Sequence, residues 1–236
     1  MDHETPFHPL HPPVSASEAR ERDLAALRDH GLPTLVLMEH AGRGVALLAA
    51  RLRAAAGPGP VVVVAGPGNN GGDGYACARF LASFEVPVRV VRVAPTEPTG
   101  ADARLEHALS RAAAGEPVVV ASEGDLSRLD EALAGASVIV DALFGIGLAR
   151  PLGAFHRAVI AHVNAAPALR LAVDVPSGME ADSGEPLPVA VRADVTAALG
   201  ARKLGCLTPA GAPYAGRLVE VDIGLPPPHR RPSIRS

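Results

Sequence analysis

Residues 61–74 read VVVVAGPGNNGGDG, and this stretch decides the fold. Four consecutive valines indicate a strand that is buried on both faces, as in a parallel sheet. The glycine-rich segment after them predicts a tight loop, and the residues from Tyr75 to Leu81 predict a helix. A strand that ends in such a loop and opens a helix presents N–H groups without internal partners, which is where α/β proteins place phosphates and sugars.

Apolar runs continue this strand–helix alternation along the chain. We expect strands at Val61–Ala65, Val86–Val93, Pro117–Ala121, Val138–Asp141, Leu169–Asp174, Val195–Leu199 and Arg217–Asp222. Helical periodicity falls near 15–30, 35–56, 73–84, 99–114, 125–134 and 152–165. Ser15 and Glu18 form a capping-box pattern at the first helix, and Gly42 and Gly44 inside the second indicate close backbone packing. The alternation predicts a parallel sheet with helices on both faces.

Composition narrows the function classes. A chain of 236 residues suits one α/β domain, and a net charge of −3 favours neither nucleic-acid binding nor a polybasic membrane surface. No apolar run reaches transmembrane length, and the N-terminus is not a signal peptide. Cys77 and Cys206 lie far apart without a CxxC partner, so zinc is disfavoured and a reducing cytoplasm is expected.

Three strands are followed by loops that carry carboxylates and glycines. Asp73 follows the first strand, Asp141 ends another, and Asp174 ends a third before Pro176-Ser177-Gly178. Because ligands bind outside the carboxyl ends of parallel strands, we expect these residues to converge on one site. Structural roles remain open: Asp73 as a helix cap, Asp141 as a cap or a partner of Arg150, and Asp174 in an Asx-turn. Oxygen ligands with few full charges suit a hard cation, such as potassium.

An ordinary nicotinamide-dependent oxidoreductase is disfavoured. The formal GxGxxG match (Gly66, Gly68, Gly71) is weak alone, and the next strand ends without the acid that usually binds ribose. Asp73 inside the loop would also repel a pyrophosphate.

Five motifs occur in a specific order: 37–42, 66–74, 141–152, 173–178 with 182–184, and 203–205 through 222–226. In these motifs the chain resembles the NAD(P)H-hydrate epimerases, the family built on the YjeF N-terminal domain. The resemblance implies a Rossmann-like, three-layer α/β/α sandwich with a mainly parallel sheet over residues 14–226, and flexible tails at 1–13 and 227–236. It also implies a homodimer that interconverts the R and S forms of hydrated NADH and NADPH (NADHX and NADPHX) at C6. A separate or fused dehydratase then restores the cofactor.

The resemblance also implies roles for individual residues. The hydrated dinucleotide would be contacted by Asn69, Asn70, Gly71, Gly72, Asp73, Gly145, Ile146, Gly147, Leu148, Ala149, Arg150, Pro151 and Asp174. A potassium ion would be held by Asn70, Asp141 and Ser177. His40 departs from the family, which usually has Asn there.

Position and chemistry lead to a hypothesis for the reaction. Epimerisation at C6 needs a proton moved on or off oxygen, and Asp174 is our acid/base candidate. Lys203 is expected to be a solvated surface residue. Arg89 and Arg92 are candidates for a 2′-phosphate. The alternative function is a non-catalytic nucleotide-binding or interaction module of the same fold, because fold alone does not imply activity.

Overall fold

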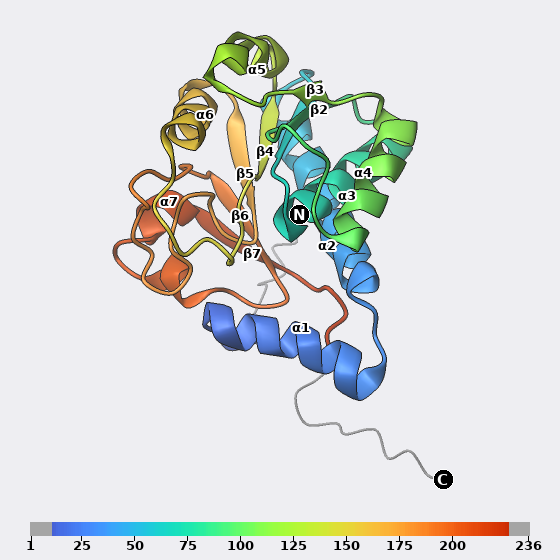
Figure 1. Cartoon of the computed structure of the whole chain (residues 1–236), viewed down its shortest axis with the longest axis vertical. Coiled ribbons are helices and arrows are strands. Elements are labelled where there is room, and N and C mark those ends of the chain that lie inside the picture. Colours follow the sequence, from blue (N-terminus) through green and yellow to red (C-terminus); the bar gives the residue numbers. More distant parts are fainter. Residues whose placement is uncertain (1–10, 227–236) are drawn as a thin grey trace, which may run out of the picture.

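Figure 1 shows the computed structural model of the chain, which describes residues 11–226. A seven-stranded, all-parallel sheet forms its centre, in the order β3-β2-β1-β4-β5-β6-β7. The strands are β1 (Val61–Ala65), β2 (Val88–Arg92), β3 (Val118–Val119), β4 (Val138–Ala142), β5 (Leu169–Val173), β6 (Val195–Leu199) and β7 (Arg217–Val221). The helices are α1 (Ala16–His30), α2 (Thr34–Ala56), α3 (Asn69–Ser83), α4 (Ala101–Ala114), α5 (Leu126–Leu133), α6 (Ala154–Ala165) and α7 (Ala212–Ala215). The predicted α/β/α sandwich is confirmed.

The four valines of β1 explain the two helical layers. Val61 and Val63 belong to the core under α2 and α3, whereas Val62 and Val64 belong to the core under α5 and α6. Successive side chains of a strand point to opposite faces, so a fully apolar strand must be covered on both. Figure 1 shows α2, α3 and α4 on one side of the sheet and α5 and α6 on the other.

The interior glycines of α2 allow it to approach its neighbours closely. A Cβ atom at Gly42 would overlap Ala76 of α3, and one at Gly44 would overlap Val221 of β7. The close packing predicted from these glycines is confirmed.

The strand order reverses beside β1. The chain passes from β1 to β2 and β3 on one side, then returns to place β4 on the other side of β1. Such a switch point opens a crevice at the carboxyl ends of the strands, where α/β proteins bind ligands.

Helix α1 lies outside both layers, at the lower end of the view in Figure 1. The predicted capping box starts it: Ser15 Oγ accepts from the Glu18 N–H at 3.2 Å, and Glu18 accepts from the Ser15 N–H at 2.7 Å. Just before the helix, the Val14 N–H donates to the Arg202 carbonyl at 2.9 Å. The Ala16 N–H donates to Asp182 at 2.6 Å. These contacts attach the helix to loops at the carboxyl edge of the sheet.

Most element boundaries follow the sequence, with three differences. Helix α3 begins at Asn69 rather than near residue 73, so the expected tight loop is the first turn of the helix. The third strand shrinks to two residues, and Asp174 lies just outside β5. The predicted tails, 1–13 and 227–236, fall outside the described residues except for 11–13. Within residues 11–226, no helix is long and apolar enough to cross a membrane.

Candidate functional site

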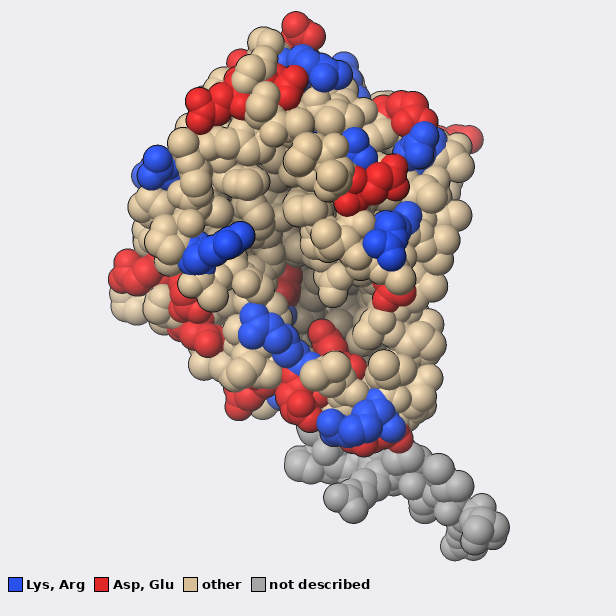
Figure 2. Space-filling model, in the orientation of Figure 1, with Lys and Arg blue, Asp and Glu red and all other residues tan. Residues whose placement is uncertain are grey.

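A pocket of about 930 Å³ opens at the carboxyl edge of the sheet. Its walls are α1, the start of α2, the first turn of α3, and the segments that follow β4, β5 and β6. Figure 2 shows the hollow in this face, with acidic and basic side chains around it. The three predicted loops therefore meet at one place, as the switch-point rule requires.

The first turn of α3 supplies one wall. Asn69, Asn70 and Asp73 line the pocket, whereas Gly71 and Gly72 do not. A Cβ atom at Gly71 would overlap the Gly66 carbonyl oxygen, and one at Gly72 would lie 2.7 Å from Met38. The glycines therefore bring the helix start against the β1 loop and α2, while the polar residues on either side of them reach the pocket.

The segment after β4 supplies the second wall. Its residues from Gly145 to Arg150 line the pocket, and Pro151 lies outside it. A Cβ atom at Gly145 would sit 3.2 Å from Asn70 Oδ1, so glycine allows this loop to pack on α3. Arg20 of α1 donates to the Ile146 carbonyl at 2.6 Å. The loop is thus held from both sides.

Asp141 and Ser177 are fully buried, and neither of them lines the pocket. The Asp141 carboxylate accepts from the Ser177 N–H at 2.8 Å and from the Leu143 N–H at 3.3 Å. Ser177 Oγ accepts from the Phe144 N–H at 2.9 Å. Burial raises the pKa of Asp141 to about 6, although these hydrogen bonds oppose the shift. The exposed Arg150 forms no ion pair with Asp141, so the alternative of such a pair is wrong.

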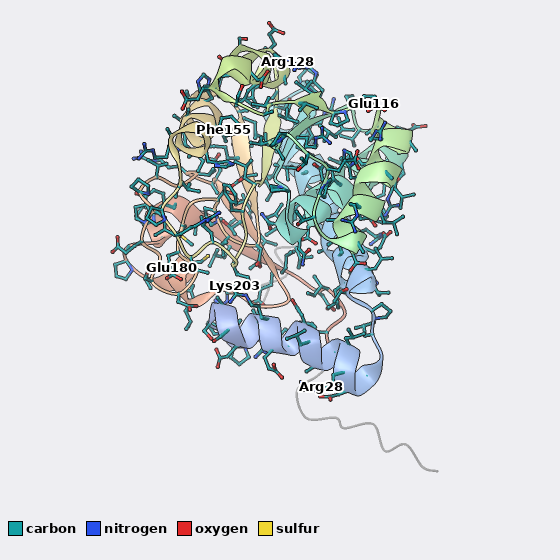
Figure 3. The ribbon with its side chains drawn as sticks, viewed as in Figure 1. Arg28, Glu116, Arg128, Phe155, Glu180 and Lys203 are labelled. Carbon is teal, nitrogen blue, oxygen red and sulfur yellow. The ribbon has the colours of Figure 1, made fainter. Side chains whose placement is uncertain are left out.

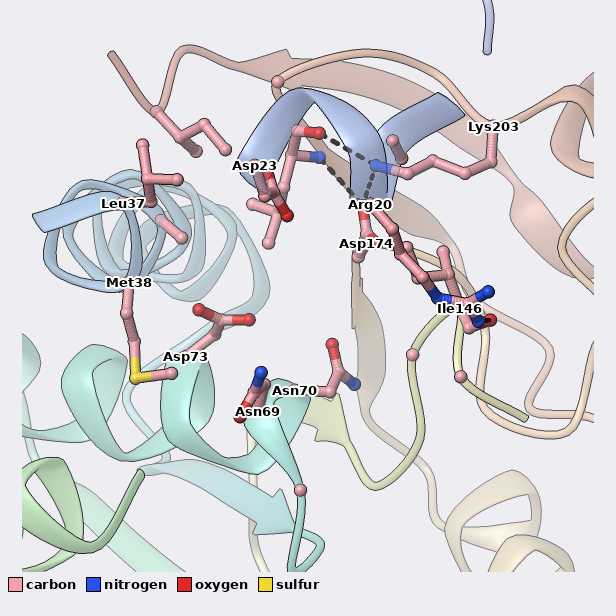
Figure 4. Close-up of a pocket in the computed structure, with 18 of the residues that line it drawn as sticks. Arg20, Asp23, Leu37, Met38, Asn69, Asn70, Asp73, Ile146, Asp174 and Lys203 are labelled. Carbon is pink, nitrogen blue, oxygen red and sulfur yellow. Dashed lines mark hydrogen bonds and ion pairs between the residues drawn. The ribbon is translucent and has the colours of Figure 1, made fainter. Parts of the chain in front are cut away.

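Asp174 forms a buried ion pair with Lys203, drawn with dashed lines in Figure 4. The exposed surface is 7% for Asp174 and 2% for Lys203. Asp174 also accepts from the Leu199 N–H at 3.2 Å, and its φ of 68° lies in the left-handed region. Aspartate tolerates this conformation better than most residues, yet it remains sparsely populated and is a mark of functional sites.

The expectation that Lys203 is solvated is therefore wrong. Its ammonium donates to Asp174, to the Leu199 carbonyl at 2.8 Å and to the Ala201 carbonyl at 3.1 Å. Three acceptors replace the water that a buried ammonium loses. One signal in the sequence could have identified this residue: Lys203 is the only lysine, because arginine stands at every other Lys or Arg position.

Besides Asp174 and Asp102 of α4, two carboxylates border the pocket, Asp23 from α1 and Asp73 from α3. Figure 4 shows them on the same cavity as Asp174 and Lys203. Burial, with Asp174 and Asp23 adding to it, raises the pKa of Asp73 well above its usual value. Burial also raises the pKa of Asp23 to about 6, with Lys203 opposing and Asp174 adding to the shift. Sequence reasoning missed Asp23, which interrupts an otherwise apolar face of the first helix.

Arg89, Arg92 and His40, which were also named from the sequence, do not line the pocket either. Arg89 donates to the Ala132 and Ala134 carbonyls at 3.1 and 3.0 Å, and neither Arg89 nor Arg92 lines the cavity. As candidates for a 2′-phosphate in this pocket they are wrong, because the strand directs them toward α5 and the β2–α4 connection. His40 bonds the Ile223 carbonyl through Nδ1 at 3.1 Å.

The parallel sheet, its switch point and the pocket at its carboxyl edge define a Rossmann-like α/β protein with a small-molecule site. The chain belongs to the family described as "YjeF-related protein N-terminus", whose model matches residues 34–205.

Curated relatives fall into two lengths. An NAD(P)H-hydrate epimerase from Limosilactobacillus fermentum is 39% identical, over 89% of this chain and 95% of the relative. One from Rhodopirellula baltica is 34% identical, over 91% of this chain and 85% of the relative. A bifunctional NAD(P)H-hydrate repair enzyme from Thermofilum pendens is 41% identical over 89% of this chain, which spans only 40% of that relative.

A solved structure has the same architecture. The crystal structure of the yeast protein ynu0 (YNL200c) aligns with a TM-score of 0.73 and 25% identity. The alignment covers 89% of this chain and 87% of the yeast chain.

Proposed function

We propose that this chain is an NAD(P)H-hydrate epimerase, an isomerase that interconverts the R and S forms of NADHX and NADPHX at C6. Relatives that carry this name match nearly their whole length. The observation that carries the proposal is the pocket, where the buried Asp174–Lys203 pair meets the polar first turn of α3. A scaffold without catalysis would have no need to hold a strained, ion-paired aspartate in a cavity.

The substrate's pyrophosphate suits the start of α3. The first N–H groups of a helix have no intrahelical partner, and no side chain caps α3. These amides and the positive end of the helix dipole favour an anion. A raised pKa favours the neutral form of Asp73, which reduces the repulsion that its position in the sequence suggests. Asn69 and Asn70 supply donors and acceptors for the ribose and carboxamide, and the segment from Gly145 to Arg150 closes the opposite wall.

We assign proton transfer to Asp174. C6 of the hydrated ring carries a hydroxyl beside the ring nitrogen, so it epimerises by ring opening and reclosure or by loss and return of water. Either route moves a proton at oxygen, which a carboxylate within hydrogen-bond reach can accept or return. Lys203 fixes the orientation of Asp174 through the ion pair between them.

We also propose potassium as the bound cation, held by Asn70, Asp141 and Ser177. The residues fit such an ion: Asp141 is fully buried and has no Lys, Arg or His within ion-pair distance among residues 11–226. Asn70 Nδ2 is buried without a hydrogen-bond partner, and turning the amide over would present its oxygen instead. Amide, hydroxyl and carboxylate oxygens suit a hard cation of low charge. When bound, the ion would neutralise Asp141 and order the loops around the pocket.

The reaction is tested by supplying the R epimer together with an excess of S-specific dehydratase. Addition of the protein should accelerate recovery of reduced cofactor, followed by its absorbance. Asp174→Asn keeps a residue that tolerates positive φ, and it should lower the rate roughly 10²- to 10⁴-fold. Exposed Asp29→Asn is the matched control. A wild-type protein without effect would refute the proposed function, and full activity of Asp174→Asn would refute only the residue assignment.

The cation is tested by comparing potassium and sodium buffers at equal ionic strength. Potassium should give the higher rate and the higher melting temperature, because we expect sodium, the smaller ion, to hold the site less well. Asp141→Asn should abolish the difference. Equal behaviour of the wild-type protein in both salts would count against the assignment.

Relatives that join two activities in one chain support a functional link to an NAD(P)H-hydrate dehydratase. A homodimer and a cytoplasmic location remain proposals. The first rests on the family resemblance and is tested by light scattering of the purified protein. The second is supported by the two free, buried cysteines, Cys77 and Cys206.

A further inference from the structure

We propose that Asp23 of α1 is a second proton-transfer residue of this pocket, working as the acid partner of Asp174. This inference rests on the proposed epimerase function and deepens it. The starting observation is a carboxylate in an unfavourable position, half-buried on a stripe of α1 that it shares with alanines.

The inner face of α1 consists of Ala16, Ala19, Asp23 and Ala26, which recur at helical spacing. Ala16 and Ala26 are 7% and 2% exposed. The remaining acids of the helix have structural roles at its surface: Glu18 caps the N-terminus, and Glu21 and Asp29 pair with Arg28. Figure 3 shows Lys203 beside the N-terminal half of α1 and Arg28 near its far end. Asp23 is thus the acid that this helix directs toward the site.

The loops hold α1 in place over the pocket. The backbone of Val14 forms hydrogen bonds with the two residues next to Lys203. Its N–H donates to the Arg202 carbonyl, and its carbonyl accepts from the Leu204 N–H at 3.0 Å. Arg20, one turn before Asp23, bonds the loop after β4. A helix anchored at both places presents Asp23 to the cavity in a defined position, which proton transfer requires.

Three carboxylates, those of Asp23, Asp73 and Asp174, interact with the single ammonium of Lys203. Asp23 faces Lys203 from the segment after β6, Asp174 from the end of β5 and Asp73 from α3. The cavity is also lined by Arg20 and Arg22 of α1, Asp102 of α4 and Arg150 of the segment after β4. Lys203 is already engaged with Asp174. Carboxylates that share a site with one ammonium cannot all ionise cheaply, so at least one retains a proton. The raised pKa of Asp23 agrees with this division, in which Asp174 is the base and Asp23 the acid.

The division matches what the reaction needs. In the ring-opening route, Asp174 takes the proton of the C6 hydroxyl, the O–H electron pair forms the C=O bond, and the C6–N1 bond breaks. Its electron pair goes to N1, which takes the proton of Asp23. After rotation about C5–C6, N1 attacks the other face of the aldehyde and returns its proton to Asp23, while the oxygen regains one from Asp174. In the water-loss route, Asp23 protonates the departing hydroxyl while the N1 electron pair forms the C6=N1 bond. Water then adds to the other face of C6 and gives a proton to Asp174, the C6=N1 electron pair returns to N1, and transfer of a proton from Asp174 to Asp23 restores both groups.

The test compares Asp23→Asn with Glu21→Gln, an equivalent change on the solvent face of the same helix. Epimer interconversion is followed by chromatographic separation of the R and S forms, with uncatalysed exchange subtracted. Asp23→Asn should lower kcat roughly 10²- to 10⁴-fold, while the Kd of unhydrated NADPH changes less than about threefold. In the wild type, kcat/KM should fall as pH rises and Asp23 loses its proton. This fall should be absent in Asp23→Asn. Glu21→Gln should behave as the wild type.

A second readout does not depend on activity. Because Lys203 is the sole lysine, ¹⁵N-lysine labelling gives one side-chain ammonium signal in NMR spectra. Its chemical shift should titrate near pH 6 in the wild type, and this inflection should be absent in Asp23→Asn. A titration that is the same in both proteins would overturn the proposal.

The outcomes separate this proposal from the one on which it rests. A wild-type protein that leaves the epimers unchanged overturns both. If the wild type is active and Asp23→Asn is fully active as well, only the role of Asp23 is overturned. The same holds if Asp23→Asn raises the KM while kcat and its pH profile stay unchanged. Loss of the fold in Asp23→Asn would also contradict the argument, because removing one of three crowded acids should not destabilise the protein.

Discussion

Replacing Lys203 by methionine is the sharpest test of the ion pair at the centre of the site. Methionine has a similar length but no charge, so it takes the place of the lysine side chain and leaves Asp174 without its cation. The side chains are 3% and 10% exposed, so water cannot replace the lost partner. Breaking a buried pair in this way costs about 3–5 kcal/mol. For a domain of this size, that loss lowers the melting temperature by roughly 6–20 °C.

A double-mutant cycle separates the pair from other effects. Urea unfolding of Lys203→Met, Asp174→Asn and the double variant gives three free-energy changes relative to the wild type. The double variant should be more stable than the sum of the single losses predicts, by about 1–3 kcal/mol, because it leaves neither charge unpaired. Additivity within about 0.5 kcal/mol, or a loss below about 1 kcal/mol for Lys203→Met, would refute a buried, mutually dependent pair.

Three further predictions concern the walls of the pocket. Gly71→Ala should lower the free energy of unfolding, measured by urea denaturation, by about 1–3 kcal/mol, because the added methyl group meets the Gly66 backbone. The control is Gly147→Ala, whose methyl group would lie in open space. The folded-state pKa of Asp23, about 6, lies above its unfolded value of 3.8, so the folded state binds this proton more tightly. The stability that this proton contributes is therefore lost as pH rises from about 4 to 6. Relative to Asp23→Asn, the wild type should therefore lose about 1–3 kcal/mol between pH 4 and pH 7, and a pH-independent difference in calorimetry would contradict this. Arg20→Ala should raise the KM severalfold by releasing the Ile146 loop, while Arg28→Ala at the exposed end of α1 should not; equal KM values would show that the bond at 2.6 Å does not order the loop.

The sequence predicted the fold closely because its signals are local. Four valines before a glycine-rich turn require a strand covered on both faces, and the repetition of this pattern requires a parallel sheet. The strand-end rule then brought Asn70, Asp141 and Asp174 to one edge. The start of α3 was misplaced because adjacent glycines and asparagines usually favour turns, whereas here contacts with Gly66 and Met38 stabilise the helix.

By itself, the sequence determined the α/β architecture, the family and the edge of the sheet that carries the site. Each of these depends on residue types at fixed spacing along the chain. Only the tertiary structure decided that Lys203 is buried against Asp174 and that Asp23 of α1 joins them. These residues are 29 and 151 positions from Asp174, so no periodicity or local motif links them. Their proximity arises from the docking of α1 and of the segment after β6 on the carboxyl edge, and burial at that contact raises the pKa of Asp23.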